Sequence, residues 1–427
     1  MRNKLAILGG RQAVTLKRFE EGEPPYTWDY PIIEDEEIEA VVKVLRSKRL
    51  CYLPNFQAGR YTKNSQLEEE FAKYVGVDYA VAVNSGTAAL HCAVAAAGVG
   101  PGDEVITSPY TFVASASCIL HQNGIPVFAD IDPITYNLDP DRVEEKITPR
   151  TKAIIAVHLY GQPASMRRLL EISEKHGLTL IEDCAQAHGA TFEGRKVGSI
   201  GHIGCFSFQE SKNMMCGEGG IITTNDAELA EKTSCVRVFG ERMRKGERRD
   251  YQARTLGWNY RMTEIQAAIA LVQLRRLDKT NEIRIKHANL LTGRLRDIPS
   301  IDAPHVAPNA THVYYIYTPI FREDIAGIPR DKFVEAIKAE GVPVFTPWPP
   351  LYALPIFQDL SGYGKGCPFR CPIYEGKVEY GSRLCPVAEQ RCKDTFNLYV
   401  HPPLNVELME QYAEAMRKVA ENASALR

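Results

Sequence analysis

The feature that most limits how this chain can fold is an alternation of short apolar runs with helical segments, which begins near Tyr79. The runs are mostly apolar instead of alternating with polar residues, and this pattern is typical of strands that are buried on both faces of a sheet. They lie at residues 80–83, 104–107, 126–131, 153–158 and 178–182, and helical segments such as 165–176 separate them. We therefore predict an α/β fold built on a mainly parallel sheet with helices on both sides.

Two amphipathic helices are expected before this sheet. The first opens with four acidic residues at 34–37, which suit the positive end of a helix dipole. The apolar positions are Ile38, Val41, Val42 and Leu45 in the first helix, and Leu67, Phe71, Tyr74 and Val75 in the second. We expect both apolar faces to pack in the core.

The pattern of elements changes after residue 299. A strand is expected at 312–320, a helix from about 330 to 340 and a short strand at 343–345. Before them, a capping box at Thr263 and Gln266 opens a long helix that continues to about residue 295. We place a boundary on this helix and predict an N-terminal arm at 1–30, a large α/β domain at 31–275 and a smaller α+β domain at 276–427. The arm is expected to pack on the main body or on a partner subunit.

Residues 205–220 place a lysine in a setting that is unusual for a free amine. A short apolar strand that carries Ser207 leads to a turn with Lys212, and a glycine-rich turn at 217–220 leads into a second apolar strand. Burying a free ammonium group is costly, and an imine with an aldehyde cofactor removes that cost. Upstream, Asp183 ends an apolar strand, which is where doubly wound sheets bind their ligands.

These three residues supply the kinds of group that pyridoxal 5′-phosphate needs. The cofactor requires a lysine for the Schiff base, an acid that keeps its pyridine nitrogen protonated, and donors for its phosphate. Each residue alone has an ordinary explanation, with Lys212 as a surface lysine in a loop and Asp183 as the N-cap of a helix. Because Lys212, Asp183 and Ser207 occur together, we predict a pyridoxal phosphate site.

Two further features could belong to this site. The turn Asn-Ser-Gly-Thr at 84–87 leads directly into a helical run at 88–97, and the free amides of a helix N-terminus bind anions. Serine and threonine are also common N-caps, but with the lysine and the acid downstream we favour a phosphate cradle. Phe112 follows a strand and could stack on a cofactor ring, although an aromatic residue in this position is more often part of the core.

The composition excludes several classes of function. Of the 427 residues, 44% are hydrophobic and 24% are charged, and the net charge is −2, so nothing in the charge balance indicates a nucleic acid or an anionic membrane as partner. No segment approaches the roughly 20 apolar residues that cross a bilayer, and we expect a cytoplasmic protein. Residues 241–254 are strongly charged and are expected to form a solvated loop, with a lid or a partner-facing flap as the alternative.

The eleven cysteines are scattered through the chain, which indicates reduced thiols instead of a secreted disulfide framework. The last four are Cys367, Cys371, Cys385 and Cys392. Their spacing is not a standard zinc pattern, so we predict no metal site and expect a loop-rich insertion with incidental thiols. A zinc site or a disulfide pair is the alternative.

Four motifs together resemble the DegT/StrS type of sugar aminotransferases, which are fold-type-I pyridoxal phosphate enzymes. They lie at residues 84–90, 181–189, 207–220 and 257–262, and the similarity extends from Leu5 to about Pro403. The resemblance implies a large domain with a mainly parallel sheet of the seven-stranded type and a smaller α+β C-terminal domain. It also implies a homodimer.

The resemblance assigns a role to each candidate residue. Lys212 would form the internal aldimine and then move a proton between substrate and cofactor, and Asp183 would pair with the ring nitrogen. Gln186 would contact the phenolic oxygen of the ring, and Phe112 would stack on the ring, which reverses the preference for a core role. The phosphate would be held by Gly86, Thr87 and Ser207, with Asn259 reaching in from the second subunit.

Within this family, the pair Phe208 and Gln209 is more like the cyclitol and aminohydroxybenzoate branch, because members that act on nucleotide sugars more often have an aromatic residue and a proline in place of Gln209 and Glu210. The implied reaction transfers the amino group of L-glutamine or L-glutamate to a keto-cyclitol such as scyllo-inosose. A nucleotide-keto-sugar aminotransferase and an aromatising aminohydroxybenzoate synthase are alternatives. Sugar dehydratases of this type replace the lysine with histidine, so Lys212 counts against them, and a regulatory protein without turnover is disfavoured because the catalytic positions are filled.

Overall fold

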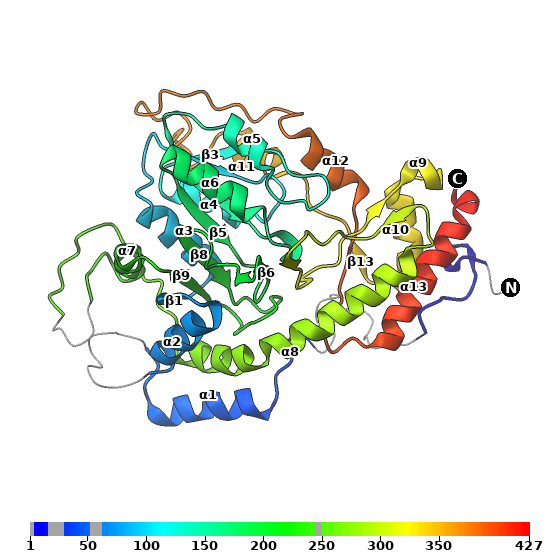
Figure 1. Cartoon of the computed structure of the whole chain (residues 1–427), viewed down its shortest axis with the longest axis horizontal. Helices are drawn as coiled ribbons and strands as arrows, with labels where there is room; N and C mark the ends of the chain where they lie inside the picture. Colours follow the sequence, from blue (N-terminus) through cyan, green and yellow to red (C-terminus); the bar gives the residue numbers. More distant parts are fainter. Residues whose placement is uncertain (1–3, 16–29, 52–61, 244–248) are drawn as a thin grey trace.

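The computed structural model describes residues 4–15, 30–51, 62–243 and 249–427 (Figure 1). A seven-stranded sheet has the order β1-β9-β8-β5-β4-β2-β3. Its strands are β1 (Tyr79–Val83), β2 (Glu104–Thr107), β3 (Ile125–Phe128), β4 (Thr151–Val157), β5 (Thr179–Asp183), β8 (Ile203–Ser207) and β9 (Gly220–Thr224). Strand β9 is antiparallel to both of its neighbours and the other adjacent pairs are parallel, which confirms the mainly parallel sheet.

Helices cover both faces of this sheet, because successive side chains of each strand point to opposite sides. Val81 and Val83 pack toward α3, whereas Ala82 between them packs toward α2 and α8. The helices of this part are α2 (Lys63–Val75), α3 (Gly86–Ala96), α4 (Ala114–His121), α5 (Pro140–Glu145), α6 (Met166–His176) and α7 (Ala227–Arg237). The sheet is therefore buried on both faces, as its continuous apolar strands require.

Helix α8 (Glu264–Leu295) is the longest element, and the capping box at Thr263 and Gln266 opens it as expected. Its first half packs on α1 (Asp35–Ser47) and α2, and its second half packs on α13 (Val406–Glu421) (Figure 1). Leu271 and Leu291 belong to different hydrophobic clusters, one beneath the sheet and one among the C-terminal elements. The boundary near residue 275 stays a prediction, because α8 is continuous across it.

The remaining elements are short. The strands are β6 (Thr191–Phe192), β7 (Arg195–Lys196), β10 (Ile301–Asp302), β11 (Ala310–Thr311), β12 (Ile320–Phe321), β13 (Val344–Phe345) and β14 (Asn397–Leu398). The helices are α9 (Glu323–Ala326), α10 (Arg330–Ala339), α11 (Pro355–Gln358) and α12 (Pro386–Asp394), with 3-10 turns at Ala6–Leu8, Leu159–Gly161, Leu351–Ala353 and Ala423–Leu426. The predicted strand at 312–320 is wrong: β11 ends at Thr311 and β12 begins at Ile320, and between them Tyr317 forms an isolated bridge with Leu398.

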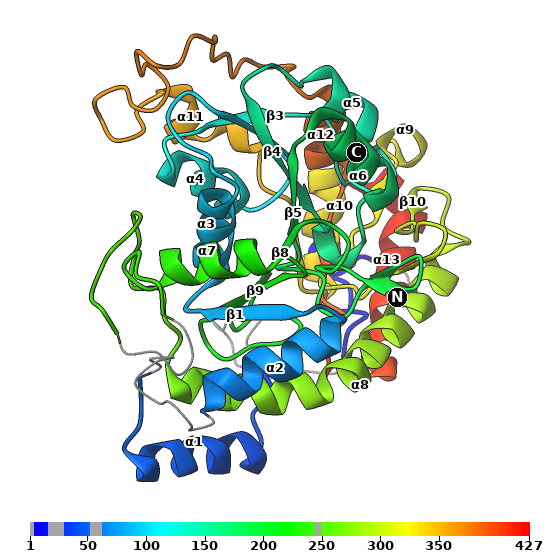
Figure 2. The same ribbon diagram turned by 60° about the vertical axis from the view of Figure 1, so that its left-hand side comes forward.

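The prediction for the first helix is also wrong in its orientation. Glu37 and Val44 are buried against α8, whereas Ile38 and Leu45 are 53% and 49% exposed. The reason is electrostatic, because the acidic N-terminus of α1 pairs with Arg276 of α8, whose Nη1 lies 3.2 Å from Glu37 Oε1. In Figures 1 and 2, α1 lies on the outside of the molecule. The second helix buries Leu67, Phe71 and Val75, as expected.

The described part of the N-terminal arm packs on the C-terminal elements. Leu5 and Val14 are buried in that core, and the carboxylate of Glu340 accepts hydrogen bonds from the amides of Ala6 at 2.8 Å and Ala13 at 2.9 Å. Residues 16–29 of the arm and 244–248 of the charged loop lie outside the described residues. None of the described helices has the length and hydrophobicity that a membrane span requires.

Candidate active site

A cavity of about 400 Å³ lies at the C-terminal ends of the parallel strands. This edge is where open α/β sheets bind ligands, because helix N-termini and strand-end loops converge there. Seven of the eight predicted site residues line it: Gly86, Thr87, Phe112, Asp183, Gln186, Ser207 and Lys212. The structure therefore brings together residues that are up to 126 positions apart in the chain. Asn259 is exposed and does not line this cavity.

One end of the cavity is a cradle at the N-terminus of α3. Ser85 is the N-cap, and its Oγ accepts a hydrogen bond from the amide of Ala88 at 3.0 Å. Gly86 lies so close to β8 that a Cβ atom there would be 2.5 Å from Cβ of Ser207. The absence of a side chain leaves free amides and the Ser207 hydroxyl facing one small space, which is the arrangement that binds a phosphate.

At the C-terminal end of β5, Asp183 is buried and held in one orientation. Its Oδ2 accepts a hydrogen bond from Ser115 Oγ at 2.7 Å, and its Oδ1 accepts one from the amide of Ala185 at 3.1 Å. Burial raises the pKa of Asp183 above its ordinary value, and these hydrogen bonds and the charge of Lys212 offset part of that rise. A carboxylate in this position is stabilised by a cationic partner inside the cavity.

Gln186 and Phe112 occupy the side of the cavity between these groups. Gln186 Oε1 accepts the amide hydrogen of Tyr160 at 2.7 Å, which leaves the Nε2 group as a hydrogen-bond donor toward the cavity. Phe112 is 52% exposed and is not part of the core, so the preference drawn from its residue type alone is wrong. Its ring meets that of Trp348, with centroids 5.8 Å apart, at the mouth of the cavity.

Lys212 is carried on a tight turn that is fixed from several directions. Its amide donates to the carbonyl oxygen of Gln209 at 2.9 Å, and the hydroxyl of Tyr30 donates to the Lys212 carbonyl oxygen. The Nζ atom points into the cavity, where it lies 3.3 Å from Tyr315 Oη and 4.3 Å from the centre of the Tyr315 ring. The amine is therefore in the cavity, within reach of a ligand held between Asp183 and the cradle.

The lining residues that were not predicted from the sequence include Ser115, Tyr315 and Trp348. Ser115 lies in α4 and has no neighbouring motif that would single it out. Tyr315 falls in the segment that was predicted to be an ordinary strand. Trp348 stands between Pro347 and Pro349, and an aromatic residue between prolines indicates a rigid exposed loop, which was the available signal.

A comparison with known protein families matches residues 31–417 to the DegT/DnrJ/EryC1/StrS aminotransferase family. The chain belongs to this family. The L-glutamine:2-deoxy-scyllo-inosose aminotransferase of Streptomyces kanamyceticus is 37% identical over 416 residues, which cover 95% of this chain and 96% of that protein. The GDP-perosamine synthase of Caulobacter vibrioides is 42% identical over 297 residues, which cover 69% of this chain and 79% of that protein.

Solved structures agree with this assignment. The crystal structure of 3-amino-5-hydroxybenzoic acid synthase matches with a TM-score of 0.79 and 30% identity, and the match covers 93% of this chain and 98% of that one. The expected fold-type-I architecture and the expected resemblance are confirmed, and the protein is an aminotransferase.

Membership of the DegT family implies pyridoxal phosphate, and the cavity fits that group. Gly86 and Ser207 enclose a small space that a Cβ atom would fill and that would suit a phosphate, and buried Asp183 offers the carboxylate that a protonated ring nitrogen would need. Gln186 presents a donor, which matches a phenolic oxygen, and Lys212 presents the amine that would bind the aldehyde.

Asn259 is held beside the turn that forms the cradle, and its side chain is exposed. Its carbonyl oxygen lies 3.5 Å from Asn84 Nδ2, and its Oδ1 accepts from Arg261 Nε at 2.9 Å. The flanking rings of Trp258 and Tyr260 are stacked at 6.0 Å. This segment of the aminotransferase is therefore well fixed and faces outward.

One group of metal-capable side chains lies close together in the described part of the chain, formed by His158, Glu182 and Cys184. His158 Nδ1 accepts the amide hydrogen of Ala164 at 3.0 Å, so its Nε2 carries the hydrogen that is donated to Glu182 at 2.9 Å. Burial alone would raise the pKa of Glu182, but hydrogen bonds from His158 and from backbone amides hold it below its ordinary value. Both ring nitrogens are used, so this group supports the strand end that carries Asp183.

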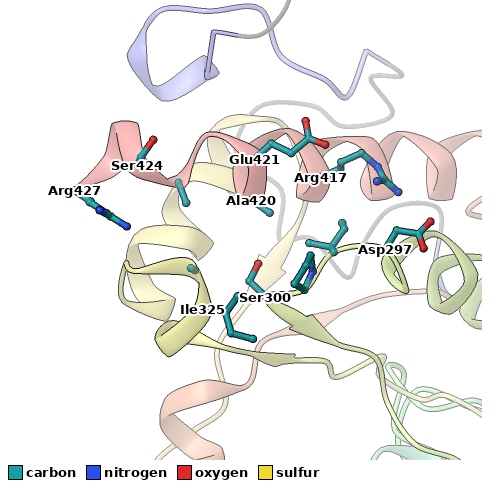
Figure 3. A pocket seen from close by; sticks show the side chains of 12 residues that line it. Asp297, Ser300, Ile325, Arg417, Ala420, Glu421, Ser424 and Arg427 are labelled. Atoms are coloured by element: carbon teal, nitrogen blue, oxygen red, sulfur yellow. The ribbon is translucent and has the colours of Figure 1, made fainter.

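None of the eleven cysteines forms a disulfide, and Cys385 is buried in an apolar setting that raises its pKa. A second hollow of about 270 Å³ lies between α13 and the elements around Ser300 (Figure 3). Asp297, Arg417 and Glu421 surround it, and it contains none of the predicted site residues. Seven of the eight predicted site residues are instead gathered in the cavity at Lys212.

Proposed function

We propose that this aminotransferase binds pyridoxal phosphate through Lys212 and transfers an amino group from L-glutamine or L-glutamate to a keto-cyclitol that resembles scyllo-inosose. The observation that carries the choice of acceptor is the charge of the cavity. Among the described residues that line it, Lys212 is the one cationic side chain, and Asp183 and Glu218 are carboxylates. An uncharged polyol suits this lining.

A sugar carried on a nucleotide would bring a diphosphate into the same site. Proteins hold phosphates with Arg and Lys side chains or with helix N-termini. The N-terminus of α3 is assigned to the phosphate of the cofactor, and the described lining offers no further cation for the diphosphate. The name of the Streptomyces kanamyceticus relative, which pairs L-glutamine with a scyllo-inosose, supports the same donor and acceptor.

When bound, pyridoxal phosphate supplies an aldehyde that condenses with amines and a ring that withdraws electrons from the adjacent carbon. Asp183 would hold the proton on the ring nitrogen, and Gly86, Thr87 and Ser207 would orient the phosphate. Lys212 would anchor the aldehyde, and once the donor amine has taken its place, Nζ would act as the base that moves a proton from the donor carbon. The same residue thus serves first as the anchor and then as the base.

The second candidate is a nucleotide-keto-sugar aminotransferase, which the 42% identity to GDP-perosamine synthase favours. An aromatising enzyme is a third, in view of the structural match to 3-amino-5-hydroxybenzoic acid synthase. The three candidates share the cofactor and the lysine and differ in the acceptor.

The test has two stages. The purified protein, supplied with pyridoxal phosphate, is scanned in the visible range before and after addition of L-glutamine, and a yellow band that bleaches would support the cofactor and the donor. The bleached enzyme is then offered scyllo-inosose or a nucleotide-linked keto-sugar. Return of the yellow band with the cyclitol alone supports the proposal, and return with the nucleotide sugar alone contradicts it. The absence of any yellow band would overturn the cofactor assignment.

The proposed assembly is a homodimer in which Asn259 of each subunit contacts the phosphate bound by the other. The outward orientation of Asn259 and the exposed apolar side chains of α1 support it. We also retain the proposed division into an arm, a large domain and a small domain at residues 30 and 275. The free thiols suit a reducing compartment such as the cytoplasm.

A further inference from the structure

We infer that Tyr315 is a further catalytic residue, which with Ser211 and Gln209 forms a hydrogen-bond chain of fixed direction that ends on Lys212 and leaves the amine lone pair free. The inference rests on the proposed function, because it concerns the proton that Lys212 moves. Its basis is the order of donors and acceptors along four adjacent groups.

The direction of the chain is set at Gln209. Its Oε1 lies 2.9 Å from the amide nitrogen of Ser211, which is a donor only, so this atom of the Gln209 side chain is the carbonyl oxygen. The hydroxyl of Ser211 lies 2.6 Å from the same oxygen. Since that oxygen can only accept, Ser211 Oγ donates its single hydrogen to Gln209.

This assignment decides the next two contacts. Ser211 Oγ is 3.0 Å from Tyr315 Oη, and because the serine hydrogen is already used, Tyr315 must donate to Ser211. Tyr315 has one hydrogen, so its Oη accepts in the contact with Lys212 Nζ at 3.3 Å. The chain therefore runs from Lys212 through Tyr315 and Ser211 to Gln209.

The consequence for Lys212 is a defined orientation. A neutral amine has two hydrogens and one lone pair, and Tyr315 takes one of the hydrogens without competing for the lone pair. The centre of the Tyr315 ring also lies 4.3 Å from Nζ, within the distance of a cation–π contact. Tyr315 thus contacts the amine through both its hydroxyl and its ring.

The step itself needs no further reactant. The C–H bond of the bound donor breaks, its proton goes to the lone pair of Lys212 Nζ, and the electron pair stays on the cofactor–substrate system. The same proton is then delivered to the cofactor carbon. Tyr315 contributes by holding the amine that carries this proton, so loss of its hydroxyl should slow proton transfer more than donor binding.

The central variant is Tyr315→Phe, which keeps the ring and removes the acceptor. We expect the rate of bleaching by L-glutamine to fall about 10- to 100-fold, with the KM for L-glutamine changed by less than about 3-fold and a larger isotope effect with α-deuterated L-glutamine. A second readout does not depend on turnover: in cofactor-free protein, the pH profile for labelling of Lys212 by a lysine reagent, followed by mass spectrometry, should shift relative to the wild type.

Tyr314→Phe is the matched control, because Tyr314 is the adjacent buried tyrosine and its ring stacks on His312 at 3.9 Å. It should leave the bleaching rate and the labelling profile unchanged. Ser211→Ala removes the acceptor for Tyr315, and we expect the double variant Ser211→Ala with Tyr315→Phe to be no slower than Tyr315→Phe alone.

A wild-type bleaching rate and labelling profile in Tyr315→Phe would overturn the inference, as would full additivity in the double variant. Failure of the proposed function is distinguishable, since in that case the wild-type protein itself would show no band or no bleaching. Melting temperatures of all variants establish whether each is folded.

Discussion

Asp183 is ionisable and almost completely buried. Its effect on the stability of the protein therefore depends on pH. Because burial raises the pKa of Asp183 in the folded cofactor-free protein, ionisation above that pKa costs folding free energy, and the cost shrinks as the pH falls from the raised pKa toward the ordinary one. We expect Asp183→Asn to raise the melting temperature of the cofactor-free protein at neutral pH, with the difference from wild type shrinking toward acidic pH. The same variant should lose orders of magnitude in transamination rate, and a variant with unimpaired turnover would contradict the assigned role.

Gly86 leaves room in the phosphate cradle because it has no side chain. In Gly86→Ala the new Cβ would meet Ser207 Cβ at 2.5 Å, so either the cradle opens or the phosphate space is filled. We expect the Kd for pyridoxal phosphate to rise at least 10-fold, measured by absorbance titration. Gly100→Ala is the control, because a Cβ there meets no atom within 4 Å. Equal affinity of the two variants for pyridoxal phosphate would show that Gly86 is not part of the phosphate cradle.

Trp348 is 63% exposed beside a cavity, and large exposed aromatic residues in such positions commonly bind ligands. Its loop is anchored by the amide of Leu351, which donates to the Pro109 carbonyl at 2.8 Å. Trp348→Ala should raise the KM for the keto acceptor about 10-fold or more, while the bleaching by L-glutamine stays near the wild-type rate. A change confined to the donor step would show that Trp348 serves the donor instead.

For single residues, the sequence predicted the site residues that can be recognised by their chemical type and their position near the end of a strand, such as Lys212 and Asp183. It did not predict Ser115, Tyr315 or Trp348, which reach the site from distant segments. Their contribution depends on where those segments pack, and no local pattern carries that information.

Among the elements, α8 supports the lysine turn from behind. Asn281 donates to the carbonyl oxygen of His188 at 2.7 Å and accepts from Asn213 Nδ2 at 3.0 Å, so it joins the segments after β5 and after β8. Asn281→Leu would leave these buried groups without their partner, and we expect a loss of about 1–3 kcal/mol in the free energy of unfolding.

Denaturant unfolding measures this loss, and Asn289→Leu is the matched control because Asn289 is exposed on the same helix. The control should change stability by less than about 0.5 kcal/mol. Equal effects at the two positions would show that the substitution acts through helix propensity alone.

The strands of the large sheet and the long helices could be predicted from the sequence, because the spacing of their apolar residues reflects which of their faces are buried. The orientation of α1 did not, because both of its faces carry apolar residues and the contact with Arg276 decided between them. The segment at 312–320 has strand-like composition but lacks a continuous partner strand, and hydrogen-bond partners are set by tertiary packing.

At the scale of the whole molecule, the proposed dimer can be tested by combining two variant subunits, because each site would need residues from both subunits. Lys212→Ala should abolish turnover, and Asn259→Ala should weaken retention of pyridoxal phosphate. In a mixed dimer of the two variants, the site with an intact lysine receives an intact Asn259 from the other subunit. We expect activity of the isolated mixed dimer to exceed that of both variant homodimers at low cofactor concentration.

Differently tagged subunits allow the mixed dimer to be purified, and a mixture of separately folded homodimers is the control. If Asn259 acts within its own subunit, the mixed dimer will show no gain over that mixture. A monomeric wild-type protein in light scattering would contradict the assembly directly.

Strand β3 forms one edge of the sheet, and residues 359–385 lie along it (Figure 2). Tyr380 donates a hydrogen bond to the carbonyl oxygen of Pro126 in this strand at 2.7 Å. Because translation proceeds at about 5–20 residues per second, the roughly 250 residues between Phe128 and Tyr380 take on the order of 10 to 50 s to synthesise. During that interval the edge is bare on the ribosome and can pair with a neighbouring nascent chain. We therefore expect this strand to stay open to pairing with other chains until the C-terminal part of the chain has been made.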